Sequence, residues 1–202
     1  NNVSEVYNSN REKIMNQAPQ MRMIFDELNK KSSVINQDLT PYIDRILPYL
    51  DQKFGGFQGS PKFPQFYVFE TLFYFYRKNK EKKYLEPVEK LLFNVCSRGL
   101  YDHLSGGIAR YTVDAEWVIP HFEKMLYDNI LFVDLLTQFY QFTKKDYYKE
   151  KLIQTINFIS REFINKDDLL GSAYDADSEG IEGKFYVWDY KELSEILKSD
   201  FD

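Results

Sequence analysis

The sequence contains very little cysteine and histidine. One cysteine, Cys96, and two histidines, His103 and His121, occur among its 202 residues. A single cysteine excludes a disulfide framework, a CxxC redox motif and a thiolate zinc site within these residues. The GxGxxG and P-loop phosphate-binding motifs are also absent. We therefore expect no bound cofactor and no metal, and we expect Cys96 to be a buried core residue because it lies on the apolar stripe of an expected helix.

Positive charge and long apolar runs are scarce as well. Lys and Arg number 26 against 31 Asp and Glu, which gives a formal net charge of −5 and makes nucleic acid an improbable partner. No apolar run approaches the roughly 20 residues that span a bilayer. The opening stretch, NNVSEVYNSNREK, lacks the apolar core of a signal peptide. These features predict a cytoplasmic protein that binds neither a membrane nor nucleic acid.

Aromatic residues, in contrast, are abundant, at 17% of the chain. They concentrate in two expected helices, residues 65–77 and 121–142, where apolar residues lie on every face, as in helices buried on all sides. The other expected helices carry their apolar residues on one face only. They cover residues 38–51 and 84–97, a stretch following residue 146, and, more weakly, residues 1–31, before a polar break at residues 32–37.

One-sided helices alternate with all-round apolar helices along the chain, as the outer and inner rings of a helical toroid require. The links that lead from an all-round apolar (inner) helix to the next one-sided (outer) helix are short. The three links that lead from an outer helix to the next inner helix are long and contain glycine. Two Gly-Gly pairs, at Gly55 and Gly106, lie 51 residues apart, which indicates repeating helical hairpins. Antiparallel hairpins would bring the three long loops to one end of the fold, where they would form a mouth. A single long helical bundle is the alternative, but it does not explain the loop lengths.

Three motifs lie in these loops: GGFQGSPKFPQ at residues 55–65, YDHLSGGIARYTVDAEWVIPHFEKMLYDN at 101–129, and SAYDADSEGIEGKFYVW at 172–188. Together they resemble the thioredoxin-fused family that includes spermatogenesis-associated protein 20 and its bacterial relatives. The resemblance covers roughly residues 54–188. It implies a thioredoxin-like domain followed by an (α/α)6 toroid similar to N-acylglucosamine 2-epimerases and six-hairpin glycosidases.

The expected fold is therefore all-α, a partial (α/α)6 toroid of helical hairpins with long loops and small β-hairpins at one end. Residues 1–36 are expected to form an N-terminal linker helix, and residues 37–202 the first half of the toroid, about three of six hairpins. The resemblance implies two partners within a longer protein, a thioredoxin-like domain and the remaining toroid. An open toroid flank would expose apolar side chains and favour self-association.

The candidate catalytic residues come from the second and third motifs. If residue 121 begins a helix at the mouth, with Pro120 in its first turn, His121 shares a face with Lys124, Met125 and Asp128 and could act as a general acid or base. A structural histidine is the alternative. The acidic loop DADSEGIEG could supply paired carboxylates for a glycosidic bond, or merely cap its own turn. An EF-hand is disfavoured because Tyr186 stands at its twelfth position. The catalytic candidates are His121, Glu123, Asp175 and Asp177.

Further residues of the loops are candidates for binding a ligand. The cations Lys62 and Arg110 suit a sugar hydroxyl, a carboxylate or a phosphate, or alternatively an ion pair with the acidic loop. Trp117 could stack on a sugar ring or anchor its loop. The candidate binding residues are Lys62, Asp102, His103, Arg110, Tyr111, Trp117 and Asp128.

The resemblance and the expected mouth point to a carbohydrate-active domain, acting as an epimerase or a glycosidase on a carbohydrate ligand. Epimerisation requires His121, whereas hydrolysis requires Asp175 or Asp177. The alternative is a non-catalytic module that binds a ligand or a partner for the attached thioredoxin-like domain. All of these hypotheses require residues 101–117 to contact residues 172–188 at one end of the fold.

Overall fold

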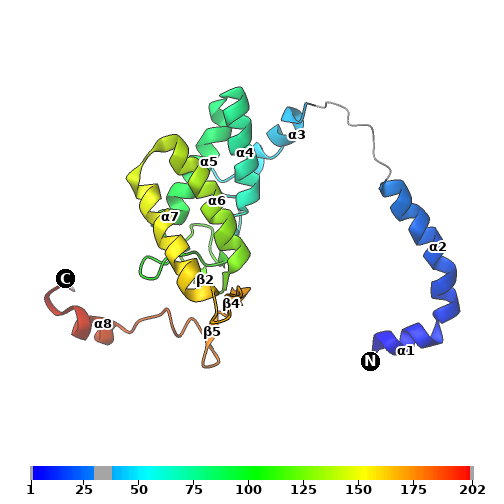
Figure 1. Cartoon of the computed structure of the whole chain (residues 1–202). Helices are drawn as coiled ribbons and strands as arrows, with labels where there is room; N and C mark the ends of the chain where they lie inside the picture. The colour runs from blue at the N-terminus through cyan, green and yellow to red at the C-terminus, as the bar shows by residue number, and fades with distance from the viewer. Residues whose placement is uncertain (1, 30–37, 201–202) are drawn as a thin grey trace. The chain divides into compact units, whose positions relative to one another are not determined.

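The computed structural model describes residues 2–29 and 38–200 of the chain (Figure 1). The chain divides into two compact units, residues 1–39 and residues 40–202. The polar break expected at residues 32–37 and the domain boundary expected after residue 36 lie outside the described residues.

The first unit contains two helices where the sequence predicts one. Helix α1 spans Asn2–Ser9 and helix α2 spans Arg11–Leu28. The helices separate at Asn10, whose ψ of 19° departs from helical geometry. No residue of α2 is buried, and its apolar side chains, such as those of Met23 and Leu28, are exposed.

The second unit is helical, with short strand pairs at one end. Its helices are α3 (Thr40–Asp44), α4 (Phe66–Asn79), α5 (Lys82–Ser97), α6 (Leu126–Thr143), α7 (Asp146–Phe158) and α8 (Tyr190–Leu197). Shorter turns are the 3-10 turns Leu47–Tyr49 and Lys198–Asp200 and the π-turn Ile159–Phe163. The strands are β1 (Tyr111–Thr112), β2 (Pro120–His121), β3 (Lys124–Met125), β4 (Ala173–Tyr174), β5 (Asp177–Ser178) and β6 (Ile181–Glu182). The all-α class is confirmed.

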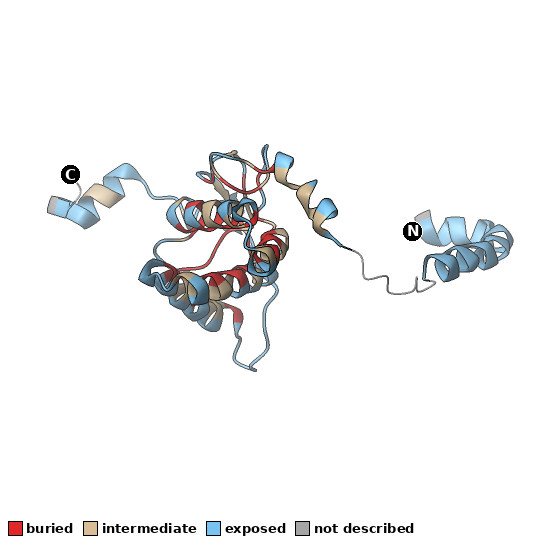
Figure 2. Ribbon diagram, turned by 90° about the horizontal axis from the view of Figure 1, so that it is seen from above, coloured by how far each residue is buried: buried red, intermediate tan, exposed pale blue. Residues whose placement is uncertain are grey.

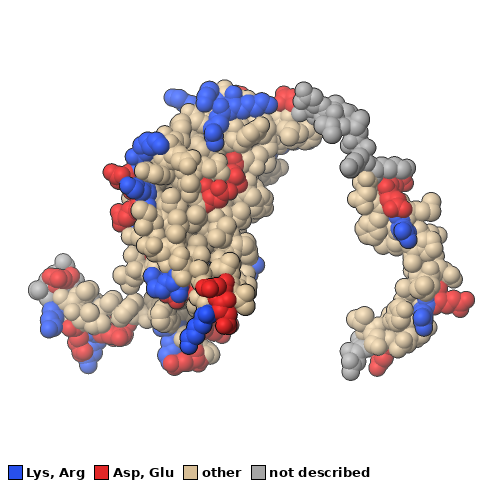
Figure 3. Space-filling model, in the orientation of Figure 1, with Lys and Arg blue, Asp and Glu red and all other residues tan. Residues whose placement is uncertain are grey.

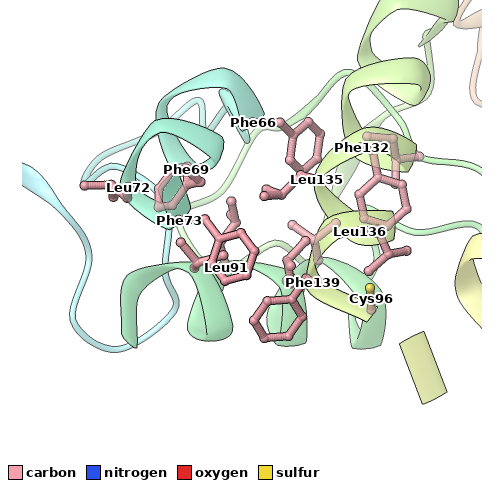
Figure 4. Close-up of a cluster of buried hydrophobic side chains, with 14 of the residues drawn as sticks. Phe66, Phe69, Leu72, Phe73, Leu91, Cys96, Phe132, Leu135, Leu136 and Phe139 are labelled. Carbon is pink, nitrogen blue, oxygen red and sulfur yellow. The ribbon is translucent and has the colours of Figure 1, made fainter. Parts of the chain in front are cut away.

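The helices form two hairpins that pack side by side. Helix α4 packs on α5, helix α6 packs on α7, and α4 and α6 contact each other, as the alternation of apolar patterns predicts (Figure 1). Buried Phe and Leu residues of α4, α5 and α6 fill the space between them, with Phe73 and Phe139 in edge-to-face contact (Figure 4). Cys96 is buried in this core, as expected.

The aromatic helices are not buried on every side. Figure 2 shows buried residues on the faces that the helices turn toward one another and exposed residues on the other faces. Tyr67 and Tyr74 of α4 and Ile130 of α6 are exposed, Tyr74 to 61%. Exposed apolar side chains therefore occur on both helices, and the open toroid flank stays a prediction. On α7 the buried face contains Tyr148, Lys151, Thr155 and Phe158, whereas Ile156, expected on that face, is exposed.

The prediction of a continuous helix over residues 38–51 is wrong. Helix α3 has five residues, and Leu47–Tyr49 forms a 3-10 turn. Pro48 has no backbone N–H and therefore cannot donate the hydrogen bond that a continuous α-helix would need at this point.

The helix expected from residue 121 begins five residues later, at Leu126. The preceding residues pair as strands instead: Tyr111 lies opposite His121, and Lys124 lies opposite Tyr174. His121, Lys124 and Met125 therefore do not share a helical face with Asp128. Backbone pairing within the second loop and with the third loop prevails over the helical spacing of these residues.

The three long loops meet at one end of the second unit. The first loop pairs with the second through Lys62 and Thr112, and the second pairs with the third through β3 and β4. Strands β5 and β6 form the hairpin expected near residues 177–183. On the face drawn in Figure 3, Asp and Glu side chains lie at this end together with Lys and Arg, whereas Lys and Arg predominate at the opposite end, over the turn from α4 to α5.

Candidate functional site

The first two loops each begin with an aspartate that organises a Gly-Gly turn. Asp51 Oδ1 accepts hydrogen bonds from the backbone N–H groups of Lys53 and Phe54, and its own N–H donates to the Gly56 carbonyl. In the second loop Asp102 makes the equivalent hydrogen bonds with residues 104, 105 and 107. The second glycine of the second turn, Gly107, has a φ of 78°, which residues other than glycine seldom adopt.

A lysine from farther along the chain completes each loop. Lys62 Nζ lies 2.5 Å from Asp51 Oδ2, and Lys124 Nζ lies 2.6 Å from Asp102 Oδ2. The lysines are only 2% and 3% exposed, and each donates a second hydrogen bond to a backbone carbonyl, of Ala115 and Gly106 respectively. We call these two arrangements the lysine clamps. Buried ammonium groups need such complete pairing.

The clamps determine the electrostatics of their aspartates. Burial acts to raise the pKa of Asp102, but the hydrogen bonds from Lys124 and from two backbone N–H groups outweigh it and hold this pKa below the usual value. The pKa of Asp51 is lowered in the same way, against burial, chiefly by Lys62. Burial lowers the pKa of Lys124, and its bond to Asp102 opposes this effect.

Three predicted binding residues therefore belong to the clamps. Lys62 and Asp102 are paired inside them, and Trp117 lies fully buried beside Lys62, with its ring centroid 5.0 Å from Nζ. Trp117 Nε1–H donates to the Phe54 carbonyl at 2.9 Å. The structure thus shows Trp117 as a loop anchor, not as an exposed stacking surface.

His121 lies in a row of stacked rings on the outer edge of the β1–β2 pair. The Tyr111 ring lies between the rings of Phe63 and His121, with centroid distances of 4.6 and 4.7 Å. Nδ1 of His121 lies 2.7 Å from Glu182 Oε1, and the imidazole is 25% exposed. A carboxylate can only accept a hydrogen bond, so Nδ1 of His121 must carry a proton and donate it to Glu182. In the neutral imidazole, Nε2 is then the unprotonated, basic nitrogen.

A second group of charges adjoins this row along the same hairpin. Arg110 pairs with Glu123 at 3.0 Å. Burial raises the pKa of Asp128 to about 6, an effect that the Arg110 charge opposes. Arg110 Nε and Asp128 Oδ2 are both enclosed without a hydrogen-bond partner. Unpaired buried polar atoms are rare in folded proteins and are a feature of functional sites.

Asp175 and Asp177 lie apart from the His121 row. Both are exposed, and Asp175 Oδ1 accepts the Asp177 backbone N–H at 3.1 Å. They line a cavity of about 320 Å³ together with Asp102 and Lys124, in which His121 takes no part. The structure therefore divides the predicted catalytic residues between two places.

The remaining predictions concern the two cations and His103. Neither Lys62 nor Arg110 pairs with the acidic loop; His121 does so instead, through Glu182. His103 is exposed, with Nε2 3.0 Å from the Arg98 carbonyl oxygen and its ring against Tyr101. Glu182, Lys124 and Asp51 were not predicted as site residues. The repeat of the Asp-x-x-x-Gly-Gly turn indicates one of them, Asp51.

Among the described residues, no three His, Cys, Asp or Glu side chains are grouped so that they could hold a metal ion. The helices within residues 2–29 and 38–200 include none with the length and apolar character needed to cross a bilayer.

Comparison with known proteins identifies homologues for this chain. Mouse spermatogenesis-associated protein 20 is 31% identical over 157 residues, which are 73% of the chain, and the human protein is 29% identical over the same share. An uncharacterized protein of Caenorhabditis elegans is 32% identical over 159 residues. The chain spans about a fifth of the length of these relatives, 20% to 22%. No protein-family model matches the chain.

Solved structures similar to this chain include sugar epimerases. A sugar epimerase from a ruminal bacterium superposes with a TM-score of 0.56 at 14% identity, covering 72% of this chain and 42% of the epimerase. Cellobiose 2-epimerase from Spirochaeta thermophila superposes with a TM-score of 0.55 at 18% identity, covering 79% and 41%. At this identity the likeness shows the fold, that of an epimerase-like helical toroid.

Proposed function

We propose that this homologue of spermatogenesis-associated protein 20 forms part of a carbohydrate-active domain whose ligand contacts the loop end of the helical hairpins. The single observation that carries the proposal is the His121–Glu182 pair, 2.7 Å apart, stacked on Tyr111. A basic nitrogen oriented by a carboxylate and partly open to solvent is the arrangement that proton transfer requires. The toroid likeness to sugar 2-epimerases supports a sugar as the ligand.

The reaction that suits this pair best is epimerisation of a reducing sugar. Nε2 of His121 takes the proton from the carbon beside the carbonyl, which leaves an enediolate. A solvent water molecule gives a proton to the opposite face of that carbon, which forms the epimer, and the His121 imidazolium returns its proton to solvent. The negative charge of the enediolate oxygen needs a nearby cation. Arg110, which neighbours Tyr111 in the chain, is the residue we assign to this role, with Glu123 and Asp128 fixing its position.

Two other functions have specific support. Hydrolysis of a glycosidic bond would use Asp175 and Asp177, which line a cavity. A binding module without catalysis is favoured by the clamps, in which Lys62, Asp102 and Trp117 are all satisfied internally. The attached thioredoxin-like domain, the remaining toroid, self-association through the apolar flank and the cytoplasmic location stay predictions.

Proton NMR in deuterated water tests the proposal on the intact protein that carries this chain, with a panel of reducing mono- and disaccharides. We expect deuterium to enter C2 of a sugar, and we expect His121→Ala to abolish this exchange. His103→Ala is the matched control, because His103 is exposed and lies outside the stacked row. Cleavage that is lost in Asp175→Asn would establish a hydrolase instead. Unchanged spectra for every sugar would favour the binding module.

A further inference from the structure

A cavity outside the proposed epimerase site lies between the second loop, the end of α7 and the third loop. Its volume is about 320 Å³. Its ionisable lining consists of Asp102, Glu162, Asp175 and Asp177 against a single lysine, Lys124, besides two tyrosines, so the lining carries a net charge of −3 at neutral pH. This charge favours a cation and opposes a phosphate or a carboxylate.

Aromatic rings form the other walls of the cavity. At its floor, Nζ of Lys124 lies 4.3 Å from the Phe158 ring centroid and 5.2 Å from that of Tyr186. An ammonium group of the protein itself therefore already lies over ring faces here. Tyr174 and Phe185 also line the cavity, and Phe185 is 73% exposed. Their ring surface is available to a second cation.

The carboxylates of the cavity differ in what they already bind. Asp102 is taken up by Lys124, and Glu162 pairs with Arg161 at 2.6 Å. Within the described part of the chain, Asp175 and Asp177 have no ion pair. Asp175 Oδ1 holds the backbone N–H of Asp177, which fixes both residues on the cavity rim. Two carboxylates beside exposed rings are left for a ligand.

We propose that this cavity binds a small organic cation, a guanidinium or primary ammonium group, between the carboxylates of Asp175 and Asp177 and the rings of Tyr174 and Phe185. The aromatic walls suit an organic cation better than a metal ion, for which no group of three donor side chains converges here. The group could belong to an arginine or lysine side chain of a polypeptide or to a free polyamine. The site is separate from the His121–Glu182 pair proposed for epimerisation, because His121 does not line this cavity.

The test is an NMR titration of the chain with N-acetyl-arginine amide, with N-acetyl-citrulline amide as the neutral isostere and spermidine as the free polyamine. We expect the arginine compound or spermidine to bind with a dissociation constant of roughly millimolar order, and the citrulline compound not to bind. Tighter binding of the arginine compound identifies a polypeptide side chain as the ligand, and tighter binding of spermidine identifies a polyamine. Both results support the proposal.

The double variant Asp175→Asn/Asp177→Asn should weaken binding by roughly fivefold, since each partly exposed charge pair contributes a fraction of a kcal/mol to about 1 kcal/mol. Asp167→Asn/Asp168→Asn is the matched control: these two exposed aspartates of the same loop do not line the cavity. Phe185→Ala should also weaken binding and replaces an exposed side chain, so folding is preserved. Equal binding of the citrulline compound, equal weakening in the control, or no binding of either cation at roughly 20 mM would overturn the proposal.

Discussion

Asp51 and Asp102 occupy the same position in two copies of one loop, 51 residues apart in the chain. Each accepts two backbone N–H groups through Oδ1 and a buried lysine through Oδ2, at 2.5 and 2.6 Å. Each lysine stands shortly before the next aromatic helix, Lys62 before α4 and Lys124 before α6. The repeat of the fold thus extends from its helices to individual hydrogen bonds.

Removing one clamp lysine should destabilise the chain strongly. Lys124→Met leaves Asp102 without its counter-charge in a mostly buried position, and we expect a loss of about 3 kcal/mol in the free energy of unfolding, since breaking a buried pair costs about 3–5 kcal/mol. Urea denaturation measures this change. Lys184→Met, which breaks the exposed pair with Glu179, is the control and should cost less than about 1 kcal/mol. Equal losses of unfolding free energy in Lys124→Met and Lys184→Met would contradict the distinction between buried and exposed ion pairs.

Stability should depend on pH through Asp128. Burial raises the pKa of this carboxyl from 3.8 to about 6, so between these values the folded state binds more protons than the unfolded state. Stability from this group is therefore highest at acid pH and falls as pH rises through about 6. Asp128→Asn should remove that fall and gain about 1–2 kcal/mol relative to wild type between about pH 4 and pH 7, a figure discounted for partial exposure.

Urea denaturation across this pH range checks the prediction, with Asp134→Asn on the same helix as the control. The pKa values of Asp51 and Asp102 are lowered instead, so stability from these groups is present above their unfolded pKa and is lost as pH falls through the folded one. The loss of stability through Asp51 and Asp102 at low pH is the same in wild type and in Asp128→Asn, so it cancels when the two proteins are compared. A difference between the two proteins that does not change with pH would refute the role of Asp128.

Glycine at position 107 should be indispensable. A Cβ there would lie 2.4 Å from Cδ1 of Phe158, and φ is 78°. Gly107→Ala should cost at least about 3 kcal/mol, because steric overlap adds to backbone strain of about 1 kcal/mol. Gly59→Ala is the matched control, since Gly59 also has positive φ but has open space around it. Thermal unfolding measures the loss of stability in both variants. The loss in Gly59→Ala reports backbone strain alone, and the additional loss in Gly107→Ala reports the steric overlap with Phe158.

Glu182 should position His121. We expect Glu182→Leu, which removes the acceptor, to lower the rate of C2 exchange roughly tenfold with little change in KM, since a group that orients a catalytic base typically contributes an effect of about this order. The nitrogen-15 chemical shifts of His121 should meanwhile show loss of the fixed Nδ1–H tautomer. Glu179→Leu, on the same hairpin but paired with Lys184, should change neither. An unaltered tautomer in Glu182→Leu would remove this role.

Much of the scaffold could be predicted because its cause is local. The apolar pattern of residues 65–77 and the glycine pairs at 55 and 106 depend on neighbouring residues alone, and they give the two hairpins and the common end of the loops. The start of α6 could not be predicted in this way. Pro120 and His121 pair with Thr112 and Tyr111 of the same loop, whereas Lys124 and Met125 pair with residues 173–174, which are remote in sequence. Pro120 also fits a strand edge as well as a helix start.

The candidate site shows the same division. His121 and Arg110 are polar residues in a motif and could be selected by type, but their partners Glu182 and Glu123 depend on how the loops fold against one another. Lys124, in the sequence HFEKM, has the pattern of a solvent-exposed helical lysine. Its burial beside Asp102 depends on a contact across 22 residues. Side-chain type indicates chemistry, whereas accessibility is decided by the fold.

The clamps also determine where this chain can be divided. Lys62 and Lys124 each belong to backbone that hydrogen-bonds to the next loop, at Thr112 and Tyr174 respectively. Neighbouring hairpins therefore share their loops, and one hairpin cannot melt without opening the clamp of another. A fragment that ends after Asn79 would lose Thr112 and the Ala115 carbonyl, which hold Lys62. A fragment that ends after Thr143 would keep both lysines with their aspartates but would lose the pairing of Lys124 with Tyr174.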